Sequence, residues 1–459
     1  MARFRALLTP CLLIVSTLAL FAAQSLPPNA HPATAEELFQ ISNVWTIRLT
    51  FSPEEWARLR PTPSGPEAPR TDGFVGPDGK RNGLSALRGL DFEYVRATLD
   101  LGTRHFTNVG VRYKGNGTYR SGNGSGKISF KIDLNKFVKG QKLDELATLN
   151  LHNNITDASW MNEVLAYRLY RDAQSPAPRT TYARLFITVP GLIATTNAGL
   201  YSIVENVDAN FAKDRFGVPG GAIFKPATQT LFKDLGPDWA SYDQAYDPKT
   251  ELTAADQQRI IEFCRLVSNA DDATFARRLP EFVELSNFAR YMAVLVWLAN
   301  PDSLLQQGQN YYVYLHPTTR KLTFIPWDQD HSFGQFMWSP LEQQQTLDIL
   351  HPWTFPSRFL ERTFQLDAFR QPYLARLREF NQTLFQADRF SRQQDELARA
   401  IRPAVEEEPV ATRREVFKLA VAGESFPRPF YGGTATPLKP FVRIRQASVA
   451  EQLSKIGRP

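Results

Sequence analysis

The stretch that decides the fold runs from Asn300 to Gly334 and reads NPDSLLQQGQNYYVYLHPTTRKLTFIPWDQDHSFG. Asp302 lies just after a long apolar segment, and Asn310 follows eight residues later at the start of an aromatic run. A second apolar run leads into the turn Asp328-Gln329-Asp330. We predict that the two runs are neighbouring strands whose ends bring these polar residues together.

These residue types, in this order, are the parts of a phosphoryl-transfer site. Such a site needs a carboxylate to orient a hydroxyl, followed by an Asn and an Asp to hold Mg²⁺ on a nucleotide. Trp327 and Phe333 flank the second turn and indicate that it is buried. Since buried acids need cations or hydrogen bonds, Mg²⁺ or Mn²⁺ is the economical partner of Asp328, Asp330 and Asn310. The alternative is an Asn-Pro-Asp turn that only ends a helix, followed by two solvated acids.

A second group of candidates precedes this stretch. Lys131 lies within Phe130-Lys131-Ile132, directly after a glycine-rich loop at 115–126. Backbone N–H groups of such a loop can cradle phosphate while an ammonium group neutralises its charge. The alternative is a solvated lysine behind a flexible hairpin connection.

Two glutamates are candidates to orient a phosphate-binding lysine. Glu163 lies on a helix that we predict from about Ala158 to Arg171, capped by Asp157. Glu205 ends an apolar strand at 199–206 and competes for that role, or lies near a nucleotide base. The alternative for Glu163 is an ordinary exposed helix acid.

The order of the predicted elements indicates an α+β fold with two lobes. We predict a β-rich lobe at 39–208 and a mainly α-helical lobe at 209–459. The predicted strands are 44–51, 94–101, 109–114, 128–134, 183–189 and 199–206, with an exposed loop at 61–86. The later predicted helices are 254–267, 275–279, 288–299 and the amphipathic stretch 357–400, followed by an irregular 401–440 and a strand and helix at 442–453.

Composition excludes some classes of protein. The hydrophobic content of 43% is enough for a sizeable core, and the net charge of +6 is too small and too dispersed for a nucleic-acid-binding surface. We therefore expect no nucleic-acid partner. Six scattered histidines do not form a zinc motif, and Cys264 fits a small buried residue of a helix.

The N-terminus has the pattern of a targeting segment. Arg3 and Arg5 precede an apolar stretch, Leu7 to Ala22, of only about 16 residues, whereas a membrane span needs roughly 20. We predict a cleaved signal peptide at 1–25 and a linker at 26–38, with an uncleaved anchor as the alternative. This predicts a secreted, periplasmic or cell-envelope protein without an integral membrane domain, and we expect a monomer.

Several motifs together resemble the CotH family, the secreted or spore-coat atypical protein kinases. The resemblance covers roughly residues 40–455. It is carried by Val111-Arg112-Tyr113-Lys114-Gly115, Ser129-Phe130-Lys131-Ile132, the helix from Trp160 to Arg171, Gly199-Leu200-Tyr201 with Glu205 and Asp208, Asn310-Tyr311-Tyr312 and, above all, the run from Ile325 to Gly334.

The resemblance implies a two-lobed, protein-kinase-like fold that binds ATP. It implies that Lys131 binds nucleotide phosphate, that Asp302 is the catalytic acid/base, and that Asn310 and Asp328 hold metal. Lys114 is a further cofactor-binding candidate. The chain departs from ordinary protein kinases, because it has neither their glycine-loop motif nor His-Arg-Asp, and Asp-Gln-Asp replaces Asp-Phe-Gly.

Two functions of different classes fit this sequence. The first is an atypical kinase that transfers the γ-phosphoryl group of ATP to Ser or Thr of a secreted or envelope protein. The second is a non-catalytic, adhesin-type binding protein on the same scaffold. A nucleotide-sugar transferase would fit the Asp-x-Asp turn but not Lys131 and the glycine loop. Only the kinase requires Asp302, Asn310 and Asp328 to converge.

Overall fold

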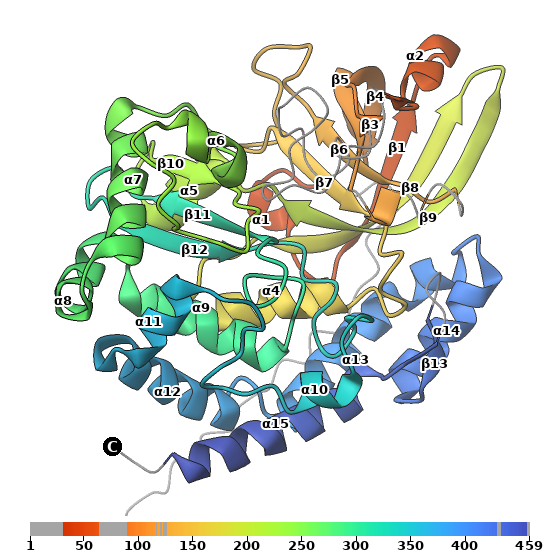
Figure 1. The fold of residues 1–459 in the computed structure, drawn as a ribbon. Coiled ribbons are helices and arrows are strands. Elements are labelled where there is room, and N and C mark those ends of the chain that lie inside the picture. The colour runs from red at the N-terminus through yellow and green to blue at the C-terminus, as the bar shows by residue number, and fades with distance from the viewer. Residues whose placement is uncertain are drawn as a thin grey trace, which may run out of the picture.

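The computed structural model describes residues 31–63, 90–115, 117–119, 122, 126–428 and 433–456. The predicted signal peptide at 1–25 and residues 64–86 of the predicted loop lie outside the described residues. The chain is an α+β protein, as predicted, with a β-rich part followed by a mainly helical part (Figure 1). Among the helices of the described ranges, none is long and apolar enough to cross a bilayer.

A closed barrel forms the β-rich part. Its strands are, in spatial order, β1 (Val44–Thr50), β4 (Val95–Leu101), β5 (Arg104–Lys114), β6 (Ser129–Asp133), β7 (Thr148–His152), β9 (Ile193–Glu205) and β8 (Thr180–Val189). Parallel pairing of β1 with β8 closes the barrel. Side chains alternate along β1 between the core and the outside, as its sequence pattern predicts.

Strand β7 was missed by the sequence analysis, although its residues alternate. Leu149 and Leu151 join the barrel core, whereas Asn150 and His152 line a cleft. All five residues of β7 are buried. The polar half of this alternation is therefore a wall of the cleft.

Most helices pack around a second, larger core. They are α4 (Asn162–Asp172), α5 (Ala209–Phe216), α6 (Ala240–Tyr246), α7 (Ala254–Asn269), α8 (Asp272–Phe282), α9 (Leu285–Leu298), α10 (Leu341–Gln345), α11 (Arg358–Gln365), α12 (Asp367–Gln382), α13 (Ala387–Glu406), α14 (Ala411–Ala422) and α15 (Leu438–Lys455). We call this the helical body. Helix α9 is apolar on nearly all sides and lies beside α4 and α12 (Figure 1). Helix α4 thus falls within 39–208 by sequence but packs with the helical body.

A small antiparallel sheet inside the helical body has the order β10 (Ala222–Phe224), β11 (Tyr311–Leu315), β12 (Leu322–Pro326). Its register pairs Phe224 with Val313 and Tyr311 with Pro326. The end of β10, the start of β11 and the end of β12 therefore lie at one edge of the sheet. The residues next to these three strand ends are brought together there.

Several predicted element boundaries were wrong. The helix expected from about Ala158 begins at Asn162, because Trp160 has a left-handed backbone (φ 57°) and Asp157 accepts hydrogen bonds from the N–H groups of Ser159 and Asn162. At the end of the predicted linker, Thr34 caps a short helix, α1 (Ala35–Leu38), whose Leu38 is buried.

The C-terminal predictions were also partly wrong. The stretch expected to be irregular, 401–440, contains the end of α13 and all of α14. Residues 442–453 belong to one helix, α15, without a strand. Two of the prolines that suggested irregular structure are Pro403, which lies inside α13, and Pro437, which is the N-cap of α15.

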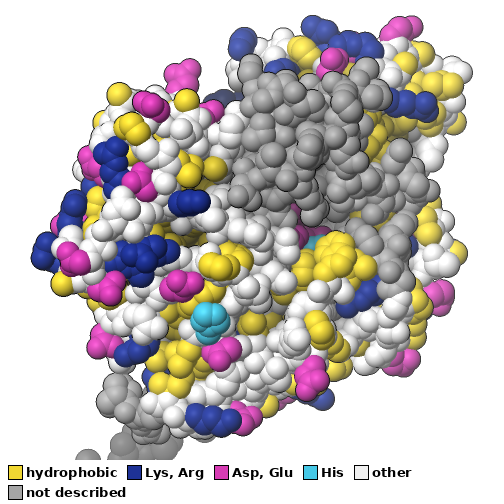
Figure 2. Space-filling view, viewed as in Figure 1, with side chains coloured by type: hydrophobic (Ala, Val, Ile, Leu, Met, Phe, Trp, Pro, Cys, Tyr) yellow, Lys and Arg dark blue, Asp and Glu magenta, His cyan; other side chains and the backbone are white. Residues whose placement is uncertain are grey.

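The surface in Figure 2 carries basic and acidic side chains in mixture, with no large single-sign patch among the described residues of that face. Two buried places among the described residues carry charge that matters for the fold and the cleft. One is the cleft described below. The other is a cluster around Glu408.

Glu408 follows α13 and fastens the helical body to the barrel. Its Oε1 lies 2.6 Å from Nζ of Lys127, just before β6, and its Oε2 accepts the N–H of Leu200 on β9 at 2.8 Å. Gly199 has φ +97°, and a Cβ there would lie 2.3 Å from Glu408 Oε2, so the carboxylate occupies space that only glycine leaves open. Arg413 on α14 lies 3.8 Å from the same carboxylate.

Removing this buried carboxylate should therefore destabilise the fold. We expect Glu408→Ala to lower the free energy of unfolding by about 3–5 kcal/mol, because it removes the buried carboxylate that Lys127 and Arg413 both approach. The matched control is Glu407→Ala, which removes a partly exposed ion pair with Arg184 and should cost only about 0–1 kcal/mol. Urea denaturation of the two variants checks this. Equal losses would contradict the anchoring role of Glu408.

Candidate active site

A cleft of about 620 Å³ is lined by residues of both the barrel and the helical body, a volume typical of small-molecule sites. The barrel contributes Lys114, Ser129, Lys131, Asn150 and His152. The helical body and its small sheet contribute Glu163, Lys225, Asn310, Tyr312, Trp327, Asp328 and Asp330. Six residues proposed from the sequence therefore share this cleft, namely Lys114, Lys131, Glu163, Asn310, Asp328 and Asp330.

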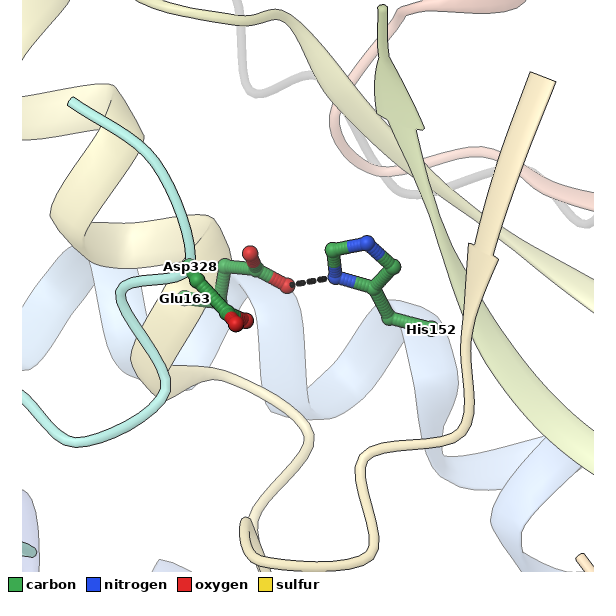
Figure 3. A group of neighbouring side chains, drawn as sticks. All are labelled: His152, Glu163 and Asp328. Carbon is green, nitrogen blue, oxygen red and sulfur yellow. Dashed lines mark hydrogen bonds and ion pairs between the residues drawn. The ribbon is translucent and has the colours of Figure 1, made fainter. Parts of the chain in front are cut away.

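His152, Glu163 and Asp328 form the tightest cluster in the cleft (Figure 3). Each offers one nitrogen or oxygen atom, and these atoms all lie within 4.8 Å of one another. His152 ends β7, Glu163 lies in the first turn of α4, and Asp328 follows β12. The other carboxylate oxygen of Glu163, Oε1, is buried and has no hydrogen-bond partner.

Lys114, at the end of β5, is connected to Glu163 through His152. Lys114 Nζ lies 2.5 Å from His152 Nε2, and His152 Nδ1 lies 2.8 Å from Glu163 Oε2. An ammonium group can only donate, so Nε2 is the acceptor and Nδ1–H donates to the carboxylate. Burial lowers the pKa of His152 well below its usual value, and the charge of Lys114 lowers it further, which agrees with a neutral ring.

The cluster fits a divalent cation. Burial raises the pKa of Glu163 and the neighbouring Asp328 raises it further, so two carboxylates are held together without enough positive charge. Burial also lowers the pKa of Lys114, against the influence of Asp328. A cation held by the carboxylates of Glu163 and Asp328 would compensate both acids and occupy the unpartnered Oε1. His152 would become a ligand only by giving up one of its two present hydrogen bonds, because a coordinating ring nitrogen needs a free lone pair.

Asn310 and Asp328 are held in unusual backbone conformations at the sheet edge. Both are left-handed, with φ 61° and 52°, a region in which Asn and Asp are enriched. Asn310 Nδ2 donates to the carbonyl oxygen of Asp302 at 2.9 Å, and Asp328 N–H donates to Tyr167 Oη at 2.9 Å. These bonds fix both residues toward the cleft before any ligand binds.

Asp330 lines the same cleft but lies outside the three-residue cluster. Its carboxylate accepts a hydrogen bond from the hydroxyl group of Thr156. Burial raises the pKa of Asp330, while His331 acts in the opposite direction. Asp330 is thus a neighbour of the candidate metal cluster, whose third member is His152, a residue that the sequence analysis had not considered.

Asp302 lies beside the cleft and is covered by Gln309. Gln309 Nε2 donates to Asp302 Oδ1 at 2.6 Å, and it is Gln309 that belongs to the cleft lining. Burial raises the pKa of Asp302, His331 lowers it, and Asp328 raises it, so the two aspartates are close enough to interact. The turn that carries Asp302 is connected to the loop that carries Asp328 by Asn300, whose Nδ2 donates to Gln329 Oε1 at 3.4 Å.

Lys131 and Glu205 have different surroundings. Lys131 lines the cleft on β6, where burial and the charges of Arg112 and Lys249 lower its pKa to about 8. The structure does not bring Glu205 to the cleft. Its carboxylate forms ion pairs with Arg179 at 2.5 Å and Arg215 at 2.7 Å. Glu205 is therefore the centre of a structural ion-pair cluster and does not orient Lys131.

Sequence analysis missed His152, Lys225 and Gln309. The alternation of Leu149, Asn150, Leu151 and His152 could have indicated a strand with one polar buried face. Lys225 follows the short apolar run of β10, which is too brief to stand out. Gln309 precedes Asn310 and carries no pattern of its own.

Comparison with known proteins identifies the family. The model of the CotH kinase protein family matches residues 111–417, most of the chain, so this protein belongs to the CotH kinase family. No curated protein matches the chain.

Among solved structures, it is similar to the HipA–HipB toxin–antitoxin complex with operator DNA from Shewanella oneidensis MR-1. The identity is 11% and the TM-score 0.27, and the likeness covers 67% of this chain and 57% of that chain, less than two thirds of its length.

Charge on Lys131 should make anion binding depend on pH. Its ammonium group loses its proton as the pH rises through about 8, so binding a polyanion above that pH requires proton uptake and becomes weaker. We expect the affinity for tripolyphosphate, measured by calorimetry, to fall between pH 7 and pH 9. Lys131→Arg should show a smaller fall, since arginine stays protonated. The same pH dependence in both proteins would exclude Lys131 as a ligand.

Proposed function

We propose that this protein is an atypical protein kinase that transfers the γ-phosphoryl group of ATP to a Ser or Thr hydroxyl, with Mg²⁺ or Mn²⁺. The observation that carries the proposal is the convergence of Lys114, Asn310 and Asp328 on one cleft, with Asp302 beside them. Each of these residues supplies one part of a phosphoryl-transfer site. Membership of the CotH kinase family supports the same reaction.

Phosphate and metal would bind at different walls of the cleft. Lys114 and Lys131 project from adjacent strands of the barrel and can neutralise phosphate oxygens. Asp328, Asn310 and Glu163 face the two lysines from the helical body. His152, at the end of β7, lies on the barrel beside Lys114. A divalent cation held there would neutralise charge on the transferred phosphoryl group. The neutral ring of His152 keeps Lys114 and Glu163 oriented through its two hydrogen bonds.

Asp302 is the residue proposed to act on the acceptor. The acceptor hydroxyl oxygen forms a bond to the γ-phosphorus, the bond from that phosphorus to the β–γ bridging oxygen breaks, and ADP leaves. The hydroxyl proton passes to the Asp302 carboxylate. Burial raises the pKa of that carboxylate above its usual value, which makes it a stronger base for this step. Gln309 must move aside or hold the carboxylate in place while the acceptor approaches.

The substrate and its location are proposals of the same kind. The resemblance to secreted kinases, together with Arg3, Arg5 and the following apolar segment, supports a protein substrate outside the cytoplasm. We propose that the kinase acts there as a monomer. Incubating the protein with labelled ATP, Mg²⁺ or Mn²⁺ and a Ser-rich peptide pool tests the reaction directly.

One observation favours a second function. The hydrogen bond from Gln309 to Asp302 covers the proposed base, as expected for a non-catalytic binding protein that keeps the kinase scaffold. Such a protein would bind nucleotide and metal without transferring phosphate. The two functions differ in whether Asp302 affects a reaction rate.

Asp302→Asn should separate chemistry from binding. We expect it to lower the rate of phosphoryl transfer by about 10²–10⁴-fold, the usual contribution of a general base. The ATP-dependent rise in melting temperature should remain, because a ligand that binds only the folded state stabilises it by mass action. Transfer at the wild-type rate would show that Asp302 is not the base.

Asp328→Asn should remove most of the metal dependence. It replaces a carboxylate of the His152–Glu163–Asp328 cluster by a neutral amide, so Mn²⁺ or Mg²⁺ should no longer add to the thermal shift produced by ATP. Asp330→Asn is the matched comparison on the same turn and should keep most of the metal effect, because Asp330 lies outside the cluster. The reverse order of effects would make Asp330 the main ligand.

A further inference from the structure

Lys225 lies directly after β10, at the sheet edge that also carries Asn310 and Asp328. Its N–H donates to the carbonyl oxygen of Asp247 at 3.1 Å. Three residues later, the N–H of Thr228 donates to the carbonyl oxygen of Gly308 at 2.9 Å. The loop that follows Lys225 is therefore fastened to the loop between Asp302 and Asn310.

The approach of these two loops requires glycine at position 308. Gly308 has φ +65°, and a Cβ there would lie 2.3 Å from the carbonyl oxygen of Thr228. No side chain could be accommodated without moving one of the loops. The position of Lys225 relative to Asn310 is thus built into the backbone.

The ammonium group of Lys225 faces the cleft beside Trp327. Its Nζ lies 5.6 Å from the ring centroids of both Trp327 and Tyr312, and Lys114 Nζ lies 5.1 Å from the Trp327 centroid. Two ammonium groups, one from the barrel and one from the helical body, therefore share one indole ring.

These two positive charges act on each other. After burial and the opposing effect of Asp328, the next cause of the lowered pKa of Lys114 is Lys225. An anion with several charged oxygens, bound between the two ammonium groups, would turn this repulsion into attraction to both.

We propose that Lys225 is a polyphosphate-binding residue, which holds the nucleotide phosphates from the helical body opposite Lys114 and selects nucleoside triphosphates over monophosphates. The inference rests on the proposed function, since it concerns the same cleft. A triphosphate has oxygens for both lysines, whereas a monophosphate offers a single phosphoryl group. Because the lysines belong to different parts of the fold, the bound chain of phosphates also links the barrel to the helical body.

Binding measurements on the full chain test this inference. Lys225→Met removes the charge but keeps an apolar stem against Trp327 and Tyr312. We expect it to weaken binding of ATP and of tripolyphosphate by about tenfold or more, the effect of losing a charged hydrogen bond, and to change AMP binding less than about twofold. Lys225→Arg should recover most of the affinity. Lys233→Met, at an exposed position of the helical body, removes the same charge and should change nothing.

The outcomes separate this inference from the proposed function. If the wild type binds tripolyphosphate, Lys225→Met binds it more weakly, and no phosphate is transferred from ATP, the inference stands and the kinase function fails. If the wild type transfers phosphate from ATP, and Lys225→Met binds ATP and tripolyphosphate as tightly as the wild type does, only the inference is overturned. Equal losses for AMP and ATP overturn the selectivity, and no binding of either polyanion by the wild type overturns both. Lys225→Gln serves if the Met variant does not fold.

Discussion

The antiparallel pairing of β10, β11 and β12 is the constraint on which the cleft depends. Its register sets the end of β10 beside the start of β11 and the end of β12. Lys225, Asn310 and Asp328, far apart in the sequence, therefore occupy one edge. All five residues of β11 and of β12 are buried, so a shift of one residue would turn buried side chains to the wrong face and displace the polar edge with them.

A neutral histidine between a lysine and a glutamate is the second organising feature. A direct pair would put two full charges in contact, whereas the Lys114–His152–Glu163 chain spreads them over two short hydrogen bonds. The same ring places a nitrogen beside Asp328. One side chain thus belongs both to the lysine network and to the candidate metal cluster. The geometry of the two sites is consequently coupled.

Much of this arrangement could be predicted from the sequence, and the rest depends on contacts between distant residues. The run from Asn300 to Gly334 indicated two strands with Asn310 and Asp328 at their ends, because apolar periodicity and turn chemistry are local signals. The local sequence around Glu205 and around Glu163 did not show which of the two would orient a phosphate-binding lysine. Only the fold shows that Arg179 and Arg215 engage Glu205, whereas Glu163 faces His152. The end of α13 and all of α14 were missed because the acids and prolines around 401–440 suggested breaks.

The bond between Lys127 and Glu408 joins residues 281 positions apart. Synthesis proceeds at about 5–20 residues per second, so Glu408 would be made roughly tens of seconds after Lys127. Until then the amino-terminal barrel would hold a buried lysine without its carboxylate. Such a long-range contact slows folding, and the barrel reaches its final packing only after the segment that carries Glu408 has been made. The same contact implies that a truncation which removes Glu408 would alter the packing of the barrel near β6.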